Sequence, residues 1–77
     1  MLKEEKAKVG NLVRLSYYGT KMKSNPRWMR GTKGYQLLGF ITGFDKGEQY
    51  PIQVRWIHKH AYDDAVHGYR ELKIARG

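Results

Sequence analysis

One stretch of the sequence gathers the residue types that bind anions. Residues 18–35 read YGTKMKSNPRWMRGTKGY and contain no acidic residue. Its cations are Lys21, Lys23, Arg27, Arg30 and Lys33, and its aromatic residues are Tyr18, Trp28 and Tyr35. Such cations pair with phosphates or carboxylates, and aromatic faces either stack on bases or anchor a protein interface. The segment is therefore the predicted binding surface, with an acidic protein or a nucleic acid as its ligand.

The same residue types also suit a purely structural role. Trp28 and Tyr35 can anchor the segment on the core, while the lysines and arginines keep it hydrated. No RNA-recognition motif, helix-turn-helix or zinc finger accompanies them. The pattern leaves binding and anchoring equally open.

A second group of chemically capable residues lies in residues 58–68, HKHAYDDAVHG. A zinc or nickel site needs three or four ligands that neighbouring groups orient. His58 and His60 share one face of an extended segment, and His67 would have to fold back towards them. We expect a hydrated polar loop without a metal. The weak candidate ligands are His58, His60 and His67, with Asp63 and Asp64 beside them.

Catalytic motifs are missing from the sequence. The chain has no cysteine, and Ser16 and Ser24 lack the G-x-S-x-G context of a nucleophilic serine. Residues 31–34, GTKG, lack the G-x-x-x-x-G-K-[ST] frame of a phosphate-binding loop. We therefore expect a non-enzymatic protein that uses no cofactor.

The positive charge is concentrated in the first half of the chain. The formal net charge is +8. Residues 6–44 contain eight cations and no acid, whereas residues 45–77 contain six cations and five acids. A one-sided positive field attracts polyanions or acidic proteins. Many small proteins, however, carry positive charge for solubility alone.

Length and composition indicate one small domain. The 77 residues are near the lower limit for unaided folding, but two Trp, six Tyr and two Phe allow a small core. The longest apolar run, about five residues, is far shorter than the roughly 18 that span a membrane. The charged start, MLKEEKAK, does not resemble a signal peptide. We expect a cytoplasmic or virion protein without membrane association.

A β-hairpin is the strongest structural prediction. Residues 37–44 and 52–57 are apolar-rich runs on either side of the polar connection 45–49. The second run alternates: Ile52, Val54 and Trp56 point one way, and the side chains between them point the other way. This alternation is typical of a half-buried strand. The first run can adopt either register, because a slip of one residue exchanges Leu38 and Phe40 for Ile41 on the inner face.

Shorter elements complete the predicted fold. Residues 12–16 form a first strand that Tyr17 continues inward, residues 69–71 form a tight turn, and residues 72–74 form a last strand. Residues 2–8 form one helical turn or a frayed tail, since about seven residues do not hold a helix without packing. Residues 18–35 are a long structureless loop in which Trp28 or Met29 plugs into the core. The predicted core is Val13, Leu15, Leu38, Phe40, Ile52, Val54, Trp56, Leu72 and Ile74, with Ile41 and Phe44 undecided.

Several of these runs resemble the strand motifs of SH3-like barrels. Residues 9–15 (VGNLVRL) resemble the opening V-G-D-x-V-R-L, with Asn11 in place of Asp. Residues 39–43 (GFITG) are similar to the second strand, G-x-I-x-x, and residues 50–56 (YPIQVRW) to the third, Y-x-V-x-W. Residues 50–56 also resemble a run in the small barrel protein of photosystem I. Short basic barrels of this pattern are similar to small open reading frames of tailed phages, particularly those that infect marine cyanobacteria.

The resemblance implies an all-β fold: a small SH3-like, partly open barrel of four to five short antiparallel strands with one long early loop. It would occupy residues 9–77, after a short helical turn or flexible tail at 1–8. Such barrels serve protein docking, nucleic-acid binding and virion assembly alike. The predicted function is docking on an acidic protein, as a virion component or a host-directed adaptor, and the alternative is nucleic-acid binding. The predicted binding residues are Lys21, Lys23, Arg27, Trp28, Arg30, Lys33, Tyr35 and Arg55.

Overall fold

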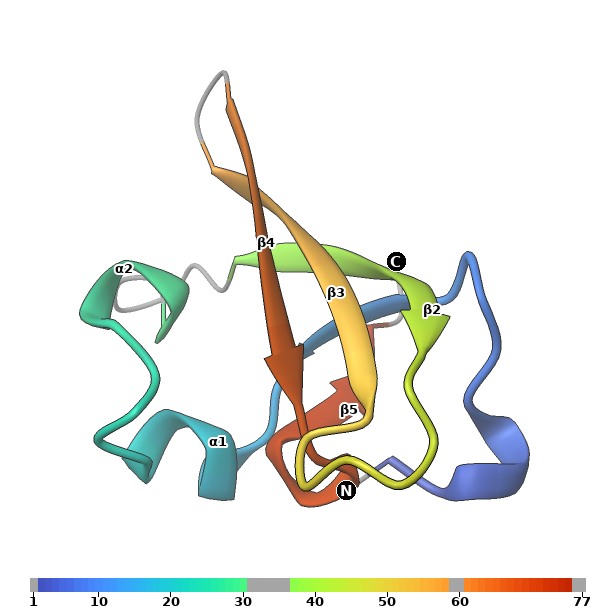
Figure 1. Ribbon diagram of the computed structural model, residues 1–77. Helices are drawn as coiled ribbons and strands as arrows, with labels where there is room; N and C mark the ends of the chain where they lie inside the picture. The colour runs from blue at the N-terminus through green and yellow to red at the C-terminus, as the bar shows by residue number, and fades with distance from the viewer. Residues whose placement is uncertain (1, 31–36, 59–60, 76–77) are drawn as a thin grey trace.

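A single antiparallel sheet of five strands forms most of the molecule (Figure 1). The structure is a computed structural model that describes residues 2–30, 37–58 and 61–75. The strand order is β4-β3-β2-β1-β5. The strands are β1 (Leu12–Leu15), β2 (Leu38–Phe44), β3 (Ile52–His58), β4 (Ala61–His67) and β5 (Leu72–Ile74). The helical elements are η1 (Glu4–Lys6), α1 (Tyr17–Lys21), α2 (Arg27–Arg30) and η2 (Tyr69–Glu71). The predicted all-β class is confirmed, and the sheet is barrel-like but not closed.

The predicted hairpin is formed by β2 and β3. The backbone N–H of Asp45 donates to the carbonyl of Pro51 at 2.7 Å and closes the connection. Gly47 within it has a φ of +90°, a conformation that glycine adopts without strain. Strand β3 alternates as predicted, with Ile52, Val54 and Trp56 fully buried.

Strand β2 turns its other face to the core. Ile41 is fully buried, whereas Leu38 is 40% exposed and Phe40 is half-buried, so their predicted core positions are wrong. Gly39 lies on the inner face, where an added Cβ would come within 2.8 Å of the indole of Trp56. The indole therefore needs a glycine opposite it. The apolar pattern of β2 alone does not show that Trp56 of β3 requires a glycine opposite it, so the pattern does not decide the register.

Most of the described part of the predicted polar loop at 58–68 is instead the strand Ala61–His67, which corrects that prediction. Strand β4 pairs with β3 from Ala61, opposite His58, to His67, opposite Ile52. The β3–β4 hairpin projects beyond the rest of the molecule (Figure 1). Most side chains of β4 are consequently exposed, and only His67 is buried. A solvated edge strand does not need an apolar alternation, and charged residues on it discourage aggregation.

The core lies on the inner face of the sheet. Six predicted members, Val13, Leu15, Ile52, Val54, Trp56 and Leu72, are buried, and Ile74 is half-buried. Leu2 joins them, and its backbone N–H donates to the carbonyl of Tyr69 at 3.1 Å. Tyr17 does not continue the inward set: it is 77% exposed because the chain turns into α1 after Ser16.

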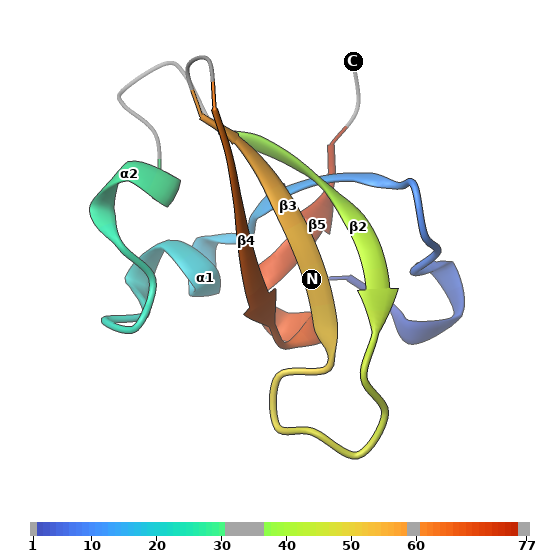
Figure 2. The same cartoon turned by 45° about the horizontal axis from the view of Figure 1, so that its top comes forward.

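Two short helices occupy the described part of the predicted structureless loop. The hydroxyl of Ser16 caps α1 by accepting the N–H of Gly19 at 3.1 Å. Helix α2 follows Pro26 and buries Met29, which is the residue of the predicted pair that enters the core. Both helices lie on the β4 side of the sheet, opposite η1 (Figures 1 and 2). Within the described ranges no helix is long and apolar enough to cross a membrane.

Candidate functional site

Helix α1 presents an aromatic ring with a cation over it. Tyr17 and Lys21 are four residues apart, so their side chains share one face of the helix. The Lys21 Nζ lies 5.1 Å from the centroid of the Tyr17 ring, within cation–π range. Both side chains are exposed. They form a positive, partly apolar projection on the surface.

A second cation–aromatic pair joins α1 to η2. The Arg70 guanidinium lies 4.4 Å from the centroid of the Tyr18 ring. The hydroxyl of Ser16 donates to the Arg70 carbonyl, and the Ser16 N–H donates to the Glu71 carbonyl at 2.7 Å. Two hydrogen bonds thus hold the start of α1 against η2. Arg70 thereby lies beside residues 16–30, which we call the early segment, although it is far from their cations in the sequence.

Two further exposed cations lie in the same segment of the chain. Lys23 and Arg27 are exposed, and residues 16–30 contain no acid. We call the set the basic–aromatic surface; it comprises Tyr17, Tyr18, Lys21, Lys23, Arg27 and Arg70. Its cations attract anions because no carboxylate within the segment neutralises them.

Two further predicted binding residues are held within the early segment. The Nη2 of Arg30 donates to the carbonyls of Met22 at 3.1 Å and of Asn25 at 3.3 Å. The Trp28 ring is half-buried and stacks on His58, with 4.9 Å between the ring centroids. Both side chains therefore have structural contacts, which is the anchoring role that the sequence left open for Trp28.

Arg55 is engaged by a neighbour on β4. Its Nε lies 2.8 Å from the Asp64 carboxylate, and both side chains are exposed. The hydrogen bond raises the pKa of Arg55 and lowers the pKa of Asp64. This pair compensates the Arg55 charge. Two of the predicted binding residues, Lys33 and Tyr35, lie outside the described residues.

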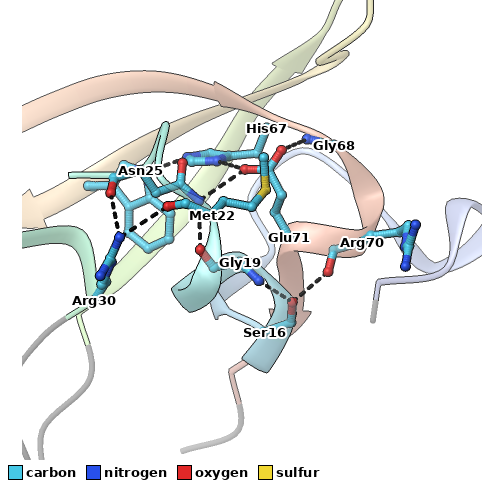
Figure 3. A network of polar contacts seen from close by, with 10 residues as sticks. Ser16, Gly19, Met22, Asn25, Arg30, His67, Gly68, Arg70 and Glu71 are labelled. Carbon is cyan, nitrogen blue, oxygen red and sulfur yellow. Dashed lines mark hydrogen bonds and ion pairs between the residues drawn. The ribbon is translucent and has the colours of Figure 1, made fainter. Parts of the chain in front are cut away.

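The basic–aromatic surface rests on a buried hydrogen-bond network around Glu71 (Figure 3). The indole N–H of Trp56 donates to Nε2 of His67 at 3.0 Å. Because an indole can only donate, Nε2 carries the lone pair and Nδ1 carries the proton. That Nδ1–H lies 2.7 Å from Oε1 of Glu71. The side chain of Trp56 thus fixes the tautomer of His67, which donates to the carboxylate.

Glu71 accepts two more hydrogen bonds. The N–H of Gly68 donates to its Oε2 at 2.7 Å, and the amide of Asn25 donates to its Oε1 at 3.2 Å. Burial opposes ionisation of this carboxyl, but the hydrogen bonds from His67 and Gly68 outweigh it and hold the pKa of Glu71 below its usual value. Glu71 is therefore an ionised residue whose carboxylate accepts three hydrogen bonds.

Asn25 connects this carboxylate to the segment that bears the cations. Its amide also donates to the carbonyl of Gly19 at 2.9 Å (Figure 3). Gly19 itself packs so closely on the Glu71 carbonyl that a Cβ would overlap it. The network thus fixes α1 and the following turn against η2 and β4.

The predicted histidine cluster is not assembled. His58 lies at one end of the β3–β4 hairpin and His67 at the other, so His67 does not fold back towards His58. The lone pair of His67 is already used by Trp56. Among the described residues, no three His, Asp or Glu side chains form a set suited to a metal. His60 lies outside these residues.

A groove lies beside the Glu71 network, and Asn25, His67 and Glu71 are among its lining residues. Pro26 and Met29 form one wall, and Tyr50 and Val66 form another, around a space of about 280 Å³. This is just below the volume of pockets that enclose drug-sized ligands. The groove has room for single side chains of a partner.

Comparison of the chain with protein-family models, with curated proteins and with solved structures found no match. The site is therefore interpreted from its own geometry.

Two members of the surface, Tyr17 and Arg70, are not among the binding residues that the sequence predicts. The expectation that Tyr17 continues the inward set is wrong, because its side chain is exposed. Arg70 lies in the predicted turn, which is η2, and its side chain is exposed too. A signal for Tyr17 exists in the sequence: Ser16 is a favourable N-cap, and the Tyr17–Lys21 spacing is that of one helical face. No sequence signal indicates that Arg70 approaches Tyr18, because that contact depends on the fold.

Proposed function

We propose that the chain is a non-enzymatic binding module that docks on an acidic protein through its basic–aromatic surface. The observation that carries the proposal is the pair of exposed tyrosines, each with a cation over its ring, in a segment without acids. Tyrosine and arginine are enriched among residues that dominate interface energies. Lysine and arginine next to them pair with carboxylates of the partner.

The aromatic rings favour a protein over a nucleic acid as the ligand, because several of their faces are already covered. One face of Tyr17 and one face of Tyr18 are occupied by cations of the chain itself. Trp28, the predicted stacking residue, is half-buried against His58. Base stacking requires open aromatic faces. Nucleic-acid binding stays the second candidate because the second face of each tyrosine lies beside several cations.

The resemblance to SH3-like barrels is part of the proposal. The strand order, the long segment between β1 and β2, and the turn η2 immediately before β5 support it. From the resemblance we further propose a phage-encoded module that acts in the virion or in the cytoplasm of the host cell.

The test is capture of the partner with charge-reversed variants. The tagged chain is incubated with a nuclease-treated lysate of its source cells. The triple variant Lys21→Glu, Lys23→Glu and Arg27→Glu is compared with a control of equal net charge. That control reverses the exposed residues Lys3, Lys6 and Lys46. We expect the first variant to bind the captured protein at least about tenfold more weakly, equivalent to about 1.4 kcal/mol, and the control to bind it like the wild type.

Equal losses in both triple variants would contradict the proposed surface, since they would reflect net charge alone. Loss of the partner on nuclease treatment would favour the second candidate. That candidate is measured directly by titration with single- and double-stranded DNA and RNA at about 50 and 200 mM salt. Binding that falls steeply with salt, and that the first triple variant loses but the control keeps, would establish it.

A further inference from the structure

The outer face of the sheet carries a row of large apolar side chains. Leu38 on β2 is opposite Ile57 on β3, and Ile57 is opposite Tyr62 on β4. On β1, Leu12 is opposite Phe40. We call these five residues the outer stripe. Leu12, Leu38, Ile57 and Tyr62 are 46%, 40%, 38% and 65% exposed.

The outer stripe is continuous across four strands. Directly opposite residues of an antiparallel pair have Cβ atoms about 5 Å apart, and residues two apart on one strand share a face. Phe40 lies opposite Leu12 and two residues from Leu38, so it joins Leu12 to the row formed by Leu38, Ile57 and Tyr62. Contiguous exposed apolar residues on a small soluble domain mark an interaction surface.

Two uncompensated cations lie at the β1 end of the stripe. Arg14 follows Leu12 on the same face of β1 and is opposite Lys73 of β5. Like charges in directly opposite positions repel. Among the described residues neither side chain forms an ion pair, and the buried Nε of Arg14 has no hydrogen-bond partner. A carboxylate placed beside this pair would offset the repulsion.

We propose that the outer stripe binds a segment of a second protein that combines apolar side chains with a carboxylate. The apolar side chains would cover the stripe, and the carboxylate would lie between Arg14 and Lys73. A second copy of this chain is a poor occupant, because each copy has a net charge of +8 and would bring further cations to this pair.

This surface is distinct from the basic–aromatic surface. Met29 of α2 belongs to the core cluster, so the helices pack on the inner side of the sheet. The side chains of the outer stripe point the other way. The inference therefore goes beyond the proposed function: the module would hold two partner segments at once, one on each side.

The test uses three synthetic peptides of about eight residues, a typical strand length. One alternates Leu and Glu, one alternates Leu and Lys, and one alternates Ser and Glu. Each is titrated into the isotopically labelled full chain while the backbone amide resonances are followed. We expect the Leu/Glu peptide alone to shift resonances of β1, β2 and β3 around Leu12, Phe40 and Ile57.

Variants separate this surface from the other one. Leu38→Thr with Ile57→Thr keeps strand-forming residues and is expected to weaken Leu/Glu binding about tenfold. Arg14→Gln should remove the preference for Leu/Glu over Leu/Lys. The charge reversals at Lys21, Lys23 and Arg27 should leave both the preference for Leu/Glu over Leu/Lys and the resonance shifts at the outer stripe unchanged. A negative result here would therefore not contradict the proposed function, and a negative result there would not contradict this inference. If the double variant does not fold, Tyr62→Ser on the exposed edge strand serves in its place.

Three results would overturn the inference. One is unchanged Leu/Glu binding by the stripe variants. Another is resonance shifts confined to residues 17–27, which would assign the peptide to the basic–aromatic surface. The third is a concentration-dependent dimer, seen in sedimentation and abolished by Leu38→Thr with Ile57→Thr, which would make a second copy the occupant.

Discussion

The carboxylate of Glu71 receives hydrogen bonds from His67, Gly68 and Asn25, which come from β4, from the turn after it and from the early segment. Removing the carboxylate would leave the Nδ1–H of His67 and the N–H of Gly68 without their acceptor, whereas the Asn25 amide would keep the Gly19 carbonyl. A buried group without its partner costs about 1–3 kcal/mol. The position of the basic–aromatic surface therefore depends on a residue that is not part of it.

Glu71→Gln should lower stability in a pH-dependent way. The folded pKa of Glu71 lies below its ordinary value of 4.5. The carboxylate therefore stabilises the fold above the unfolded pKa, and this contribution is lost as the pH falls through the folded pKa. We expect the variant to be about 1–3 kcal/mol less stable than the wild type at neutral pH. This difference in the free energy of unfolding should become smaller below about pH 4.5.

Urea unfolding at a series of pH values measures this gap. Glu48→Gln, an exposed residue of the β2–β3 connection, is the matched control and should differ little from the wild type at any pH. If the loss in the free energy of unfolding caused by Glu71→Gln were the same at neutral and acidic pH, the charge of the carboxylate would not contribute to stability.

Gly19→Ala tests the contact between α1 and η2. Alanine favours a helix by about 1 kcal/mol over glycine, so helix propensity alone predicts stabilisation. The added Cβ would, however, overlap the carbonyl of Glu71. We expect a net loss of about 1–3 kcal/mol in the free energy of unfolding.

Gly68→Ala is the control for this substitution. At Gly68 an added Cβ would meet only the Glu71 Oε2, at 3.5 Å, and the φ of −87° suits any residue. Thermal unfolding should rank the control near the wild type and Gly19→Ala clearly below it. A Gly19→Ala protein as stable as the control would mean that α1 is not held tightly against η2.

At the scale of elements, helix α2 acts as a core element within the early segment. Met29 is 2% exposed and belongs to the cluster that includes Trp56. Trp28 beside it packs against the same cluster and stacks on His58. The short helix therefore fastens the segment that bears the cations onto the sheet.

Met29→Ala should destabilise the protein by about 2–5 kcal/mol, because it removes a buried side chain and leaves a cavity. Lys23→Ala, an exposed residue of the same segment, should stay within about 0.5 kcal/mol of the wild type. Both are compared by urea denaturation. Equal, small effects of the two substitutions would show that residues 22–30 fold independently of the core.

The sequence allowed the hairpin β2–β3 and the strands β1 and β5 to be predicted, because their apolar residues alternate against one core. It did not reveal β4, since an edge strand in solvent needs no apolar pattern and Asp63 and Asp64 disfavour strands. Because β4 was not predicted, the ion pair between Arg55 of β3 and Asp64 of β4 could not be predicted either. The register of β2 depended on Trp56 meeting Gly39, a contact between strands.

For the candidate site, composition located the cations but not their arrangement. Lys21, Lys23 and Arg27 are exposed in the structure. Arg30 is bonded to backbone carbonyls of its own segment, which only the folded path of residues 22–25 makes possible. Arg70 joins the surface through η2, from the other end of the chain.

At the scale of the whole molecule, the basic–aromatic surface and the outer stripe lie on different sides of the sheet. Helices α1 and α2, which carry most members of the basic–aromatic surface, lie on the β4 side of the sheet (Figure 2). The outer stripe points away from the core, to which Met29 of α2 belongs. In the proposed function, the net charge of +8 would attract acidic partners from a distance, and the tyrosines and the stripe would then supply short-range contacts. Together the two proposals describe a small docking module with one binding surface on each side.

The most direct test of the proposed function is carbodiimide cross-linking of the captured complex. This reagent joins an amine to a carboxylate that already touches it, so it reports which lysines meet acidic residues. After nuclease treatment and mass spectrometry, we expect links from Lys21 and Lys23 to Asp or Glu of the partner. Links confined to Lys3, Lys6 and Lys46, which are equally exposed but lie elsewhere, would contradict the account.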